Sequence, residues 1–569
     1  MVLACCLPLL LFAAMDRRFP NDHDIFYTTG LTDVVWRMQH AESLGAWLTP
    51  LVERTTIGAH PPLGQLVLLL WIAVFGASRA AFVTANLPFV LALAIGTFGV
   101  ARRFLEERGA LVVTWAMATL PFLLCYGRKR EPFFHLAALV PLGLWAALVI
   151  VEDARTGRAR WGPWLAFAGV ELARVYTHHI VLADVAITTV VVCVLALRSA
   201  ADRPDVLRRV GATAGLLLVG ASWSLGLGEA LGIASEWSFP RYWRWRAHYL
   251  QGELDRPYST ALEMIVGQSW RWHLMPGALL WWLLPGLGAA AAWWRSAEAR
   301  PALAMLFGPA LLQLPLMWHV VANGGAPVDW GMLVIGPLMG GAVALAAVLP
   351  PARTRLWQGG LVLIGLWTAG APLLAGAVGP DPLVDRTAYT TGPLAGFTLI
   401  DTGHDAARHI PSRAPDPLGS LLAELDDPGE VVVFDGHELW LDESSNCTWT
   451  DEIRLRFKLS SNWPALAHGI RHVDSTPEAG EPTVGAVALL LYEPMNRAQD
   501  QLEAGQGDHL GAALSCIEDA RVQFAASLGR PVEEVRLVDD PRQALRTMEW
   551  YEPSPYLRQA LVWMRPSGS

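Results

Sequence analysis

Two carboxylates and a histidine lie in one polar loop near the start of the sequence. The carboxylates are Asp22 and Asp24, followed by the aromatic pair Phe26 and Tyr27, and the histidine is His60. A carboxylate can remove a proton from a hydroxyl, and a histidine can donate a hydrogen bond to a phosphate. Asp22 and Asp24 equally suit a helix N-cap or a solvated turn, and His60 equally suits the cap of a helix that begins at two prolines. Both interpretations stay open on these residues alone.

A second set of candidate side chains could hold a phosphate group. Arginine binds phosphate through two parallel hydrogen bonds, and its planar group combines well with aromatic rings. The same residue types also form the belt that anchors a protein at a membrane surface. For the arginine segments the two interpretations are evenly balanced, and for the two histidines the belt is favoured. The candidates are Arg128, Arg130 and Glu131 in one segment, His178 and His179 in a second, and Arg241, Arg244 and Arg246 among the aromatic residues of a third.

Three more charged residues lie within apolar runs. Glu171 and Arg174 are three residues apart, a spacing that places both on one face of a helix, and we predict an internal ion pair between them. Asp184 lies in the next apolar run and is predicted to be a structural hydrogen-bonding group.

The elements that carry these residues are membrane helices by composition. The chain has 569 residues, of which 53% are hydrophobic and only 17% are charged. A soluble globular protein carries about 25% charged residues, so an ordinary cytosolic enzyme, a disordered protein and a nucleic-acid binder are excluded. Apolar runs of spanning length follow the first run, 1–15, at 79–101, 110–126, 133–151, 162–177, 180–197, 211–228, 275–294, 302–321, 330–349 and 358–377.

The orientation of these runs depends on the apolar segment 61–77. The short loops between alternate runs are denser in arginine than the longer loops, which favours the short loops as cytoplasmic. With a cytoplasmic N-terminus, this arrangement requires 61–77 to lie along the outer face as a juxtamembrane or re-entrant helix. We therefore predict about eleven transmembrane helices in residues 1–378, with an outer loop at 16–78.

The C-terminal part, 379–569, has a different character. It carries 30 acidic and 15 basic residues and no further apolar run of spanning length. Short strand-like runs alternate with helical stretches, which predicts a small α/β domain on the outer side of the membrane. The predicted strands are 431–434, 486–492 and 561–564, and the predicted helix is 510–528.

Two of the six cysteines, Cys447 and Cys516, belong to this C-terminal part. An extracytoplasmic compartment is oxidising, so we predict a disulfide between them. The alternative is a pair of buried free thiols.

The order of these segments resembles that of the GT-C glycosyltransferases. These integral membrane enzymes include the protein O-mannosyltransferases and the aminoarabinose transferase of lipid A. In that family an acidic residue opens the first outer loop, as Asp24 or Asp22 does here, and a motif such as His-Pro-Pro-Leu follows, as it does here from His60. The Tyr-Thr-His-His stretch that ends at His179 is similar to a segment of some bacterial members.

The resemblance implies an inverting transfer of a sugar from a polyprenyl-phosphate donor to an envelope lipid, glycan or protein. The reaction would occur at the outer face of the bacterial cytoplasmic (inner) membrane. Asp24 would be the catalytic base, with Asp22 as the second choice, and Glu131 would take the place of a second outer carboxylate. His60 and the arginines would bind the donor phosphate. Some members use a divalent cation, Mg²⁺ or Mn²⁺, and others do not.

Two other functions stay open. One is a transporter or flippase of lipid-linked precursors with an outer receptor domain. Transporters usually show related halves, and the sequence shows no internal repeat, which favours the enzyme. The other is a GT-C homologue without activity, because Asp24-Ile25 or Asp22-His23 stands where the family has Asp-Glu.

Overall fold

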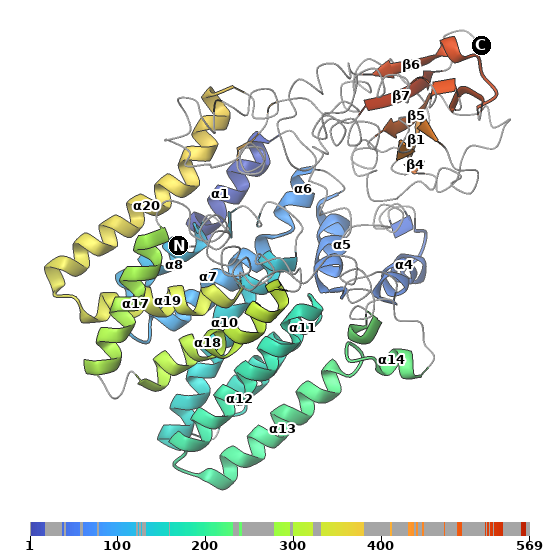
Figure 1. Cartoon of the computed structure of the whole chain (residues 1–569). Helices are drawn as coiled ribbons and strands as arrows, with labels where there is room; N and C mark the ends of the chain where they lie inside the picture. Colours follow the sequence, from blue (N-terminus) through green and yellow to red (C-terminus); the bar gives the residue numbers. More distant parts are fainter. Residues whose placement is uncertain are drawn as a thin grey trace. The chain divides into compact units, whose positions relative to one another are not determined.

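The computed structural model describes the helical part of the chain and a set of strands near its C-terminal end (Figure 1). The described residues are 2–16, 37–38, 41–56, 61–76, 79–120, 123–124, 127, 132–158, 160–231, 238–241, 278–295, 300–322, 332–380, 388, 410–411, 413, 431–436, 440–441, 447–448, 471–472, 486–491, 518, 521–522, 524–526, 528–538 and 559–564.

Each apolar run predicted from the sequence contains a helix. These helices are α1 (Val2–Met15), α7 (Leu87–Ala101), α8 (Glu107–Ala118), α10 (Pro132–Thr156), α11 (Gly162–Val175), α12 (Leu182–Ser199), α13 (Arg203–Ala221), α17 (Ala278–Arg295), α18 (Arg300–Ala322), α19 (Met332–Val348) and α20 (Pro351–Val378). Among the described residues, three helical stretches are long and apolar enough to cross a membrane: Phe133–Thr156, Leu182–Ser199 and Arg353–Val378. The number and direction of the crossings stay predictions.

Shorter helices lie between or before these. They are α4 (Leu44–Thr56), α5 (Leu63–Phe75), α6 (Arg79–Thr84), η1 (His179–Val181) and α14 (Leu227–Ala230). Helix α5 occupies the segment 61–77 that was predicted to lie along the outer face.

The predicted run 79–101 is not one helix. Helix α6 ends at Thr84, and α7 begins at Leu87 with Asn86 as its N-cap. Pro88 lies in the first turn of α7. Proline has no N–H to donate to the preceding turn, but its fixed backbone angle suits the start of a helix, and this explains the break.

The chain divides into two compact units. Unit 1 comprises Met1–Leu11, Glu53–Val67 and Asn86–Pro372, and unit 2 comprises Phe12–Val52, Leu68–Ala85 and Leu373–Ser569. The predicted domain boundary at residue 378 is close to the last of these divisions and stays a prediction.

Helices α7 and α10 of unit 1 approach each other closely through glycines. A side chain at Gly96 would collide with the backbone at Pro141 and Leu142 of α10, and one at Gly99 would collide with the indole of Trp145. Small residues at such contacts let two helix backbones come together where lipid supplies no hydrophobic driving force.

Three turns meet at one end of unit 1. Arg103, in the α7–α8 turn, forms an ion pair with Glu152 near the end of α10. The backbone N–H of Ala201, in the α12–α13 turn, donates to the carbonyl of Ala154 at 2.9 Å. Three of the arginine-containing loops predicted to be cytoplasmic are therefore neighbours, and the other ends of the same helices lie on the opposite side of the unit.

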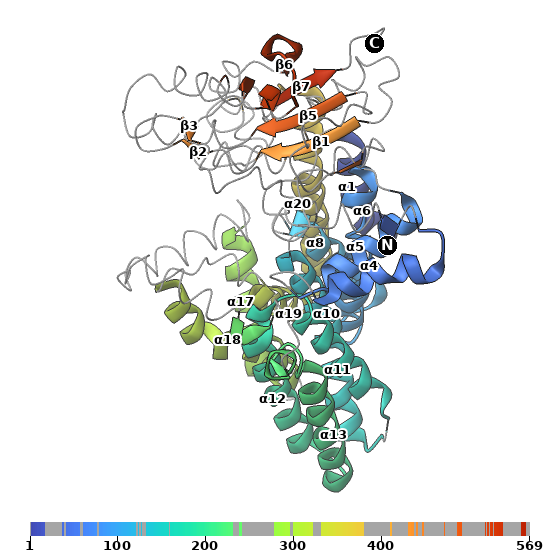
Figure 2. The ribbon, with the colours of Figure 1, turned by 90° about the vertical axis from the view of Figure 1, so that its right-hand side faces the viewer.

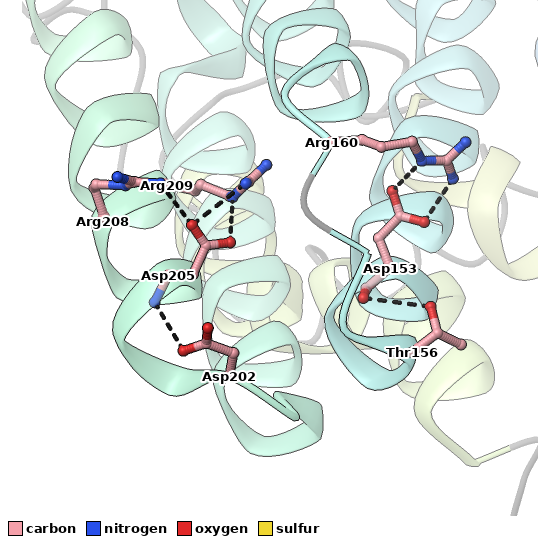
Figure 3. Close-up of polar contacts among 7 residues, drawn as sticks. All are labelled: Asp153, Thr156, Arg160, Asp202, Asp205, Arg208 and Arg209. Atoms are coloured by element: carbon pink, nitrogen blue, oxygen red, sulfur yellow. Dashed lines mark hydrogen bonds and ion pairs between the residues drawn. The ribbon is translucent and has the colours of Figure 1, made fainter.

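Two charged contacts close the turns at this end (Figure 3). Arg160 donates to both carboxylate oxygens of Asp153, at 2.8 and 2.5 Å. Arg209 Nε donates to Asp205 Oδ2 at 2.8 Å, and Asp202 caps α13 by accepting from the backbone N–H of Asp205. Hydrogen bonding from Arg209 holds the pKa of Asp205 below its usual range.

The strands of unit 2 include a five-stranded mixed sheet (Figure 2) with the order β4-β1-β5-β7-β6. Strand β1 pairs in parallel with β4 and β5, whereas β7 pairs antiparallel with β5 and β6. The strands are β1 (Val431–Gly436), β4 (Arg471–His472), β5 (Ala486–Leu491), β6 (Val535–Val538) and β7 (Gln559–Met564), with a separate pair β2 (Trp440–Leu441) and β3 (Cys447–Thr448). The three strands predicted from the sequence are β1, β5 and β7.

Candidate functional site

The structure describes some of the candidate residues that were predicted from the sequence and leaves others outside the described part of the chain. His178, His179 and Arg241 are described. The others lie outside the described residues: Asp22, Asp24, His60, Arg128, Arg130, Glu131, Arg244 and Arg246. Of the predicted disulfide, Cys447 lies in β3 and Cys516 lies outside the described residues, so the pairing stays a prediction.

The segment after His60 is tied to the Tyr-Thr-His-His stretch. Helix α11 ends at Val175, and the carbonyl of the next residue, Tyr176, accepts a hydrogen bond of 2.9 Å from the backbone N–H of Leu63. The hydroxyl of Tyr176 donates to the carbonyl of Gly220 near the end of α13, at 2.6 Å. Three chain segments that are far apart in sequence are thus joined at Tyr176.

The two histidines that follow are buried. His178 is 3% exposed and packs its ring against Phe133, with ring centroids 5.7 Å apart. His179 is 1% exposed, and its Nδ1 lies 3.4 Å from the hydroxyl of Ser224. Belt residues at a membrane surface would be partly exposed, so this burial favours an internal role for both side chains.

Phe239, just before the arginine–aromatic segment, contacts both Ser224 and His179. The backbone N–H of Phe239 donates to the carbonyl of Ser224 at 2.8 Å, and the Phe239 ring lies 6.3 Å from that of His179. Ser238 is fully buried, donates to the carboxylate of Glu229 at 2.9 Å and accepts from the backbone N–H of Arg241. The Arg241 side chain is exposed. Arg241 is therefore two residues after Phe239, whose ring contacts His179.

A second buried junction was not foreseen from the sequence. Asn86, which is fully buried, donates from Nδ2 to the carbonyl of Gly127 at 2.9 Å, and its Oδ1 lies 2.8 Å from His135 Nε2. The imidazole stacks on Phe89 with centroids 4.0 Å apart, and its other edge faces Gly64, where a Cβ atom would lie 3.0 Å from Nδ1. Asn86 and His135 are polar residues inside apolar runs, and this feature of the sequence could have identified them.

The Asn86 junction includes two glycines that lie close in sequence to candidate segments. Gly127 directly precedes the segment that begins at Arg128, and Gly64 lies four residues after His60. Both contacts are at the end of unit 1 where α7 and α10 begin, which is also where α11 ends at Tyr176. The described residues Gly64, Gly127, Tyr176 and Arg241, which adjoin or belong to four of the predicted segments, therefore lie at one end of the helical unit, opposite the arginine-containing turns.

The predicted ion pair between Glu171 and Arg174 is confirmed. Arg174 Nη1 donates to Glu171 Oε2 at 2.7 Å, and Nη2 donates to Asp184 of α12. Asp184, predicted to be a hydrogen-bonding group, also accepts from Gln313 of α18. These four residues lie in the interior of unit 1, and no pattern in the sequence indicated that Gln313 joins them.

No group of three or more potential metal-ligating side chains occurs in the part of the chain that the structure describes. The outer-loop carboxylates Asp22, Asp24 and Glu131 lie outside that part, so the predicted divalent cation stays untested.

The fold is similar to that of a known membrane transferase. The structure aligns with ArnT from Cupriavidus metallidurans bound to undecaprenyl phosphate, with a TM-score of 0.53 and 15% identity over 99% of this chain and 97% of that one. The apo state of the same protein gives a TM-score of 0.51 with the same identity and coverage. ArnT is an aminoarabinose transferase of GT-C fold, so the GT-C fold predicted for this chain is confirmed.

A weaker alignment exists with the oligosaccharyltransferase of Archaeoglobus fulgidus, solved in complex with Zn and sulfate. Its TM-score is 0.40 and its identity is 10%, over 88% of this chain and 69% of that one. No protein-family model matches the sequence, and no curated protein matches it.

Proposed function

We propose that the protein is a membrane glycosyltransferase that transfers a sugar from a polyprenyl-phosphate donor to an envelope acceptor at the outer face of the bacterial cytoplasmic membrane. The GT-C fold supports a donor of this class, since ArnT was solved with undecaprenyl phosphate. The observation that carries the proposal is the hydrogen bond from Leu63 to Tyr176. It joins the His-Pro-Pro-Leu motif to the Tyr-Thr-His-His stretch, the two segments that carry much of the family resemblance.

The proposed reaction is a single displacement at the anomeric carbon of the donor sugar. Asp24 accepts the proton of the acceptor hydroxyl, whose oxygen attacks the anomeric carbon. The bond from that carbon to the phosphate oxygen breaks, the configuration inverts, and the polyprenyl phosphate leaves. His60 and the arginines near Arg128 and Arg241 bind the phosphate and neutralise the charge that develops on it.

The buried histidines contribute by position in this proposal. His178 and His179 are held between Phe133, Ser224 and Phe239, and their proposed role is to support the segments that bind the phosphate.

A deletion strain complemented with wild-type or variant protein tests this function. Mass spectrometry of envelope lipids and glycans is expected to show the loss of one sugar unit on deletion, its return with wild-type protein, and no return with Asp24→Asn. Immunoblotting of membranes controls for expression. An envelope that is unchanged in all strains contradicts the proposal, and accumulation of an intact lipid-linked precursor favours the transporter instead.

The outer-face location is tested separately. A cysteine in place of Trp161, in the α10–α11 turn, is expected to react with a membrane-impermeant thiol reagent only in inside-out vesicles. A cysteine in place of His60 is expected to react only in intact cells or right-side-out vesicles. Labelling of both positions from the same side contradicts the proposed topology.

A further inference from the structure

Three ionisable side chains lie together in the interior of the helical unit, close to the end that carries Tyr176, His178 and His179: the backbone carbonyl of Arg174 accepts from the N–H groups of Thr177 and His178. Glu171 and Arg174 come from α11 and Asp184 comes from α12, and they are 1%, 2% and 4% exposed. Arg174 is bonded to both carboxylates. A guanidinium group stays protonated in proteins, so this triad carries a net charge of minus one if both carboxylates are ionised.

Among the described residues around the triad, none carries a charge that balances it. The triad lines a small cavity, with about 20 Å³ available to the centre of a water molecule, between α10, α11, α12, α18 and α19. Besides the triad, the residues that line it are uncharged, with Thr188 the only other polar side chain and with Pro309 and Pro337 in the helix walls. An unbalanced charge in such an interior is strongly unfavourable, and it is removed either by a proton or by a bound cation.

The hydrogen bonds distinguish the two carboxylates. Asp184 accepts at Oδ2 from Arg174 and at Oδ1 from Gln313, so both of its oxygens receive donors, as an ionised carboxylate requires. Among the described residues, Glu171 accepts only at Oε2, from Arg174. Its Oε1 faces Gly143 of α10, where a Cβ atom would lie only 2.7 Å away. Glu171 is therefore the member of the triad with an oxygen that no donor from the described part of the chain reaches.

We infer that Glu171 holds a proton on this free oxygen, so that the triad consists of a neutral Glu171, a charged Arg174 and a charged Asp184. The triad is then a proton-binding site inside the helical unit. Its occupancy maintains the connection from α11 through Asp184 to Gln313, which is fully buried on α18. Loss of the proton would place a second negative charge beside Asp184 and weaken the packing of α18 against α11 and α12. This inference is independent of the proposed enzymatic function.

Infrared spectroscopy of the full-length protein in lipid nanodiscs tests the inference directly. At neutral pH the wild type is expected to show the C=O band of a protonated carboxyl group, and this band should shift when the glutamates carry ¹³C. The band should be absent in Glu171→Gln. It should also be absent in Asp184→Asn, because Glu171 then ionises to pair with Arg174. Asp153→Asn, which removes a buried carboxylate bonded to Arg160, is the matched control and should retain the band.

Thermal unfolding gives a second readout. The unfolding temperature of the wild type is expected to fall as the pH rises from about 4.3, the pKa of glutamate in the unfolded chain, towards neutral, because unfolding then releases the proton that the native state holds; Glu171→Gln should lack this dependence. Replacing sodium by choline should change neither protein. An unfolding temperature that rises with sodium only in the wild type, without a protonated-carboxyl band, overturns the inference and identifies a cation site. If Glu171→Gln does not fold, Asp184→Asn and the ¹³C shift still decide the outcome.

Discussion

The backbone N–H of Leu63 lies 2.9 Å from the carbonyl oxygen of Tyr176 and donates to it. The two residues come from segments separated by more than four helices of the fold, yet this bond sets the start of α5 against the end of α11. Leu63 is the last residue of the His-Pro-Pro-Leu motif that begins at His60. The first prediction concerns the two carboxylates that precede this motif in the sequence.

Asp24→Asn is expected to be inserted in the membrane normally but to lose activity by about 10²–10⁴-fold, because an amide cannot accept the proton of the acceptor hydroxyl. Asp22→Asn is the matched control and is expected to retain substantial turnover. The measurement is sugar transfer in membranes that contain equal amounts of each variant. Loss of activity only in Asp22→Asn would move the base by two residues, and wild-type turnover in both variants contradicts the proposed mechanism.

Asn86→Ala is expected to destabilise the helical unit by about 1–3 kcal/mol, because it leaves the buried carbonyl of Gly127 and the imidazole of His135 without these partners. Thermal unfolding in detergent measures the change. Thr156→Ala, which removes an exposed hydroxyl that donates to the carbonyl of Glu152 in the same helix, is the control and should stay near wild type.

The same variant tests whether the Asn86 junction positions the phosphate-binding segments. Binding of undecaprenyl phosphate should weaken in Asn86→Ala at a temperature where circular dichroism shows the helices intact. Asn86→Gln, which keeps both amide functions, should restore part of the binding. Unchanged binding in Asn86→Ala restricts the junction to a structural role.

Gly96→Ala is expected to lower stability by about 1–3 kcal/mol, because its Cβ would collide with the backbone of α10 at Pro141 and Leu142. Gly169→Ala on α11 has open space around it and should be neutral, or more stable by about 0.5–1 kcal/mol through helix propensity. The two variants are compared by thermal unfolding under identical conditions. Equal effects would show that α7 and α10 are not in close contact.

Asp205 is expected to make stability depend on pH in the acid range. Its pKa is held low by hydrogen bonding from Arg209, so its contribution is complete above the unfolded-state value of about 3.9 and is lost as the pH falls through the folded value. The wild type should therefore be more stable than Asp205→Asn near neutral pH, and the difference should shrink on acidification. A difference that does not change with pH contradicts this assignment.

A disulfide between Cys447 and Cys516 is expected in protein isolated without reductant. It would close a loop of roughly 70 residues and stabilise the C-terminal part by about 4 kcal/mol in the chain-entropy model. Thiol alkylation of the denatured, unreduced protein, followed by mass spectrometry, counts the free thiols in this part. Two alkylated cysteines there exclude the bridge, and the pair Cys5 and Cys6, which are free in the structure, serves as the internal control.

The sequence by itself determined where the helices and the main strands form. Each apolar run contains a helix, and the strands β1, β5 and β7 lie where short runs of apolar residues predicted them. The pairing of Glu171 with Arg174 was also predictable, because three residues on a helix bring two side chains to one face. These features depend on interactions between residues that are close in sequence.

Only the tertiary structure decided which of these elements meet. Asp184 and Gln313 are 129 residues apart, and Asn86 and His135 are 49 apart, so no local pattern could show that each pair is in contact. A buried polar group must find a partner, but the choice among many distant partners is made by how the helices pack. The sequence therefore identified the polar residues inside apolar runs, and helix packing assigned Glu171 and Asp184 to a single arginine.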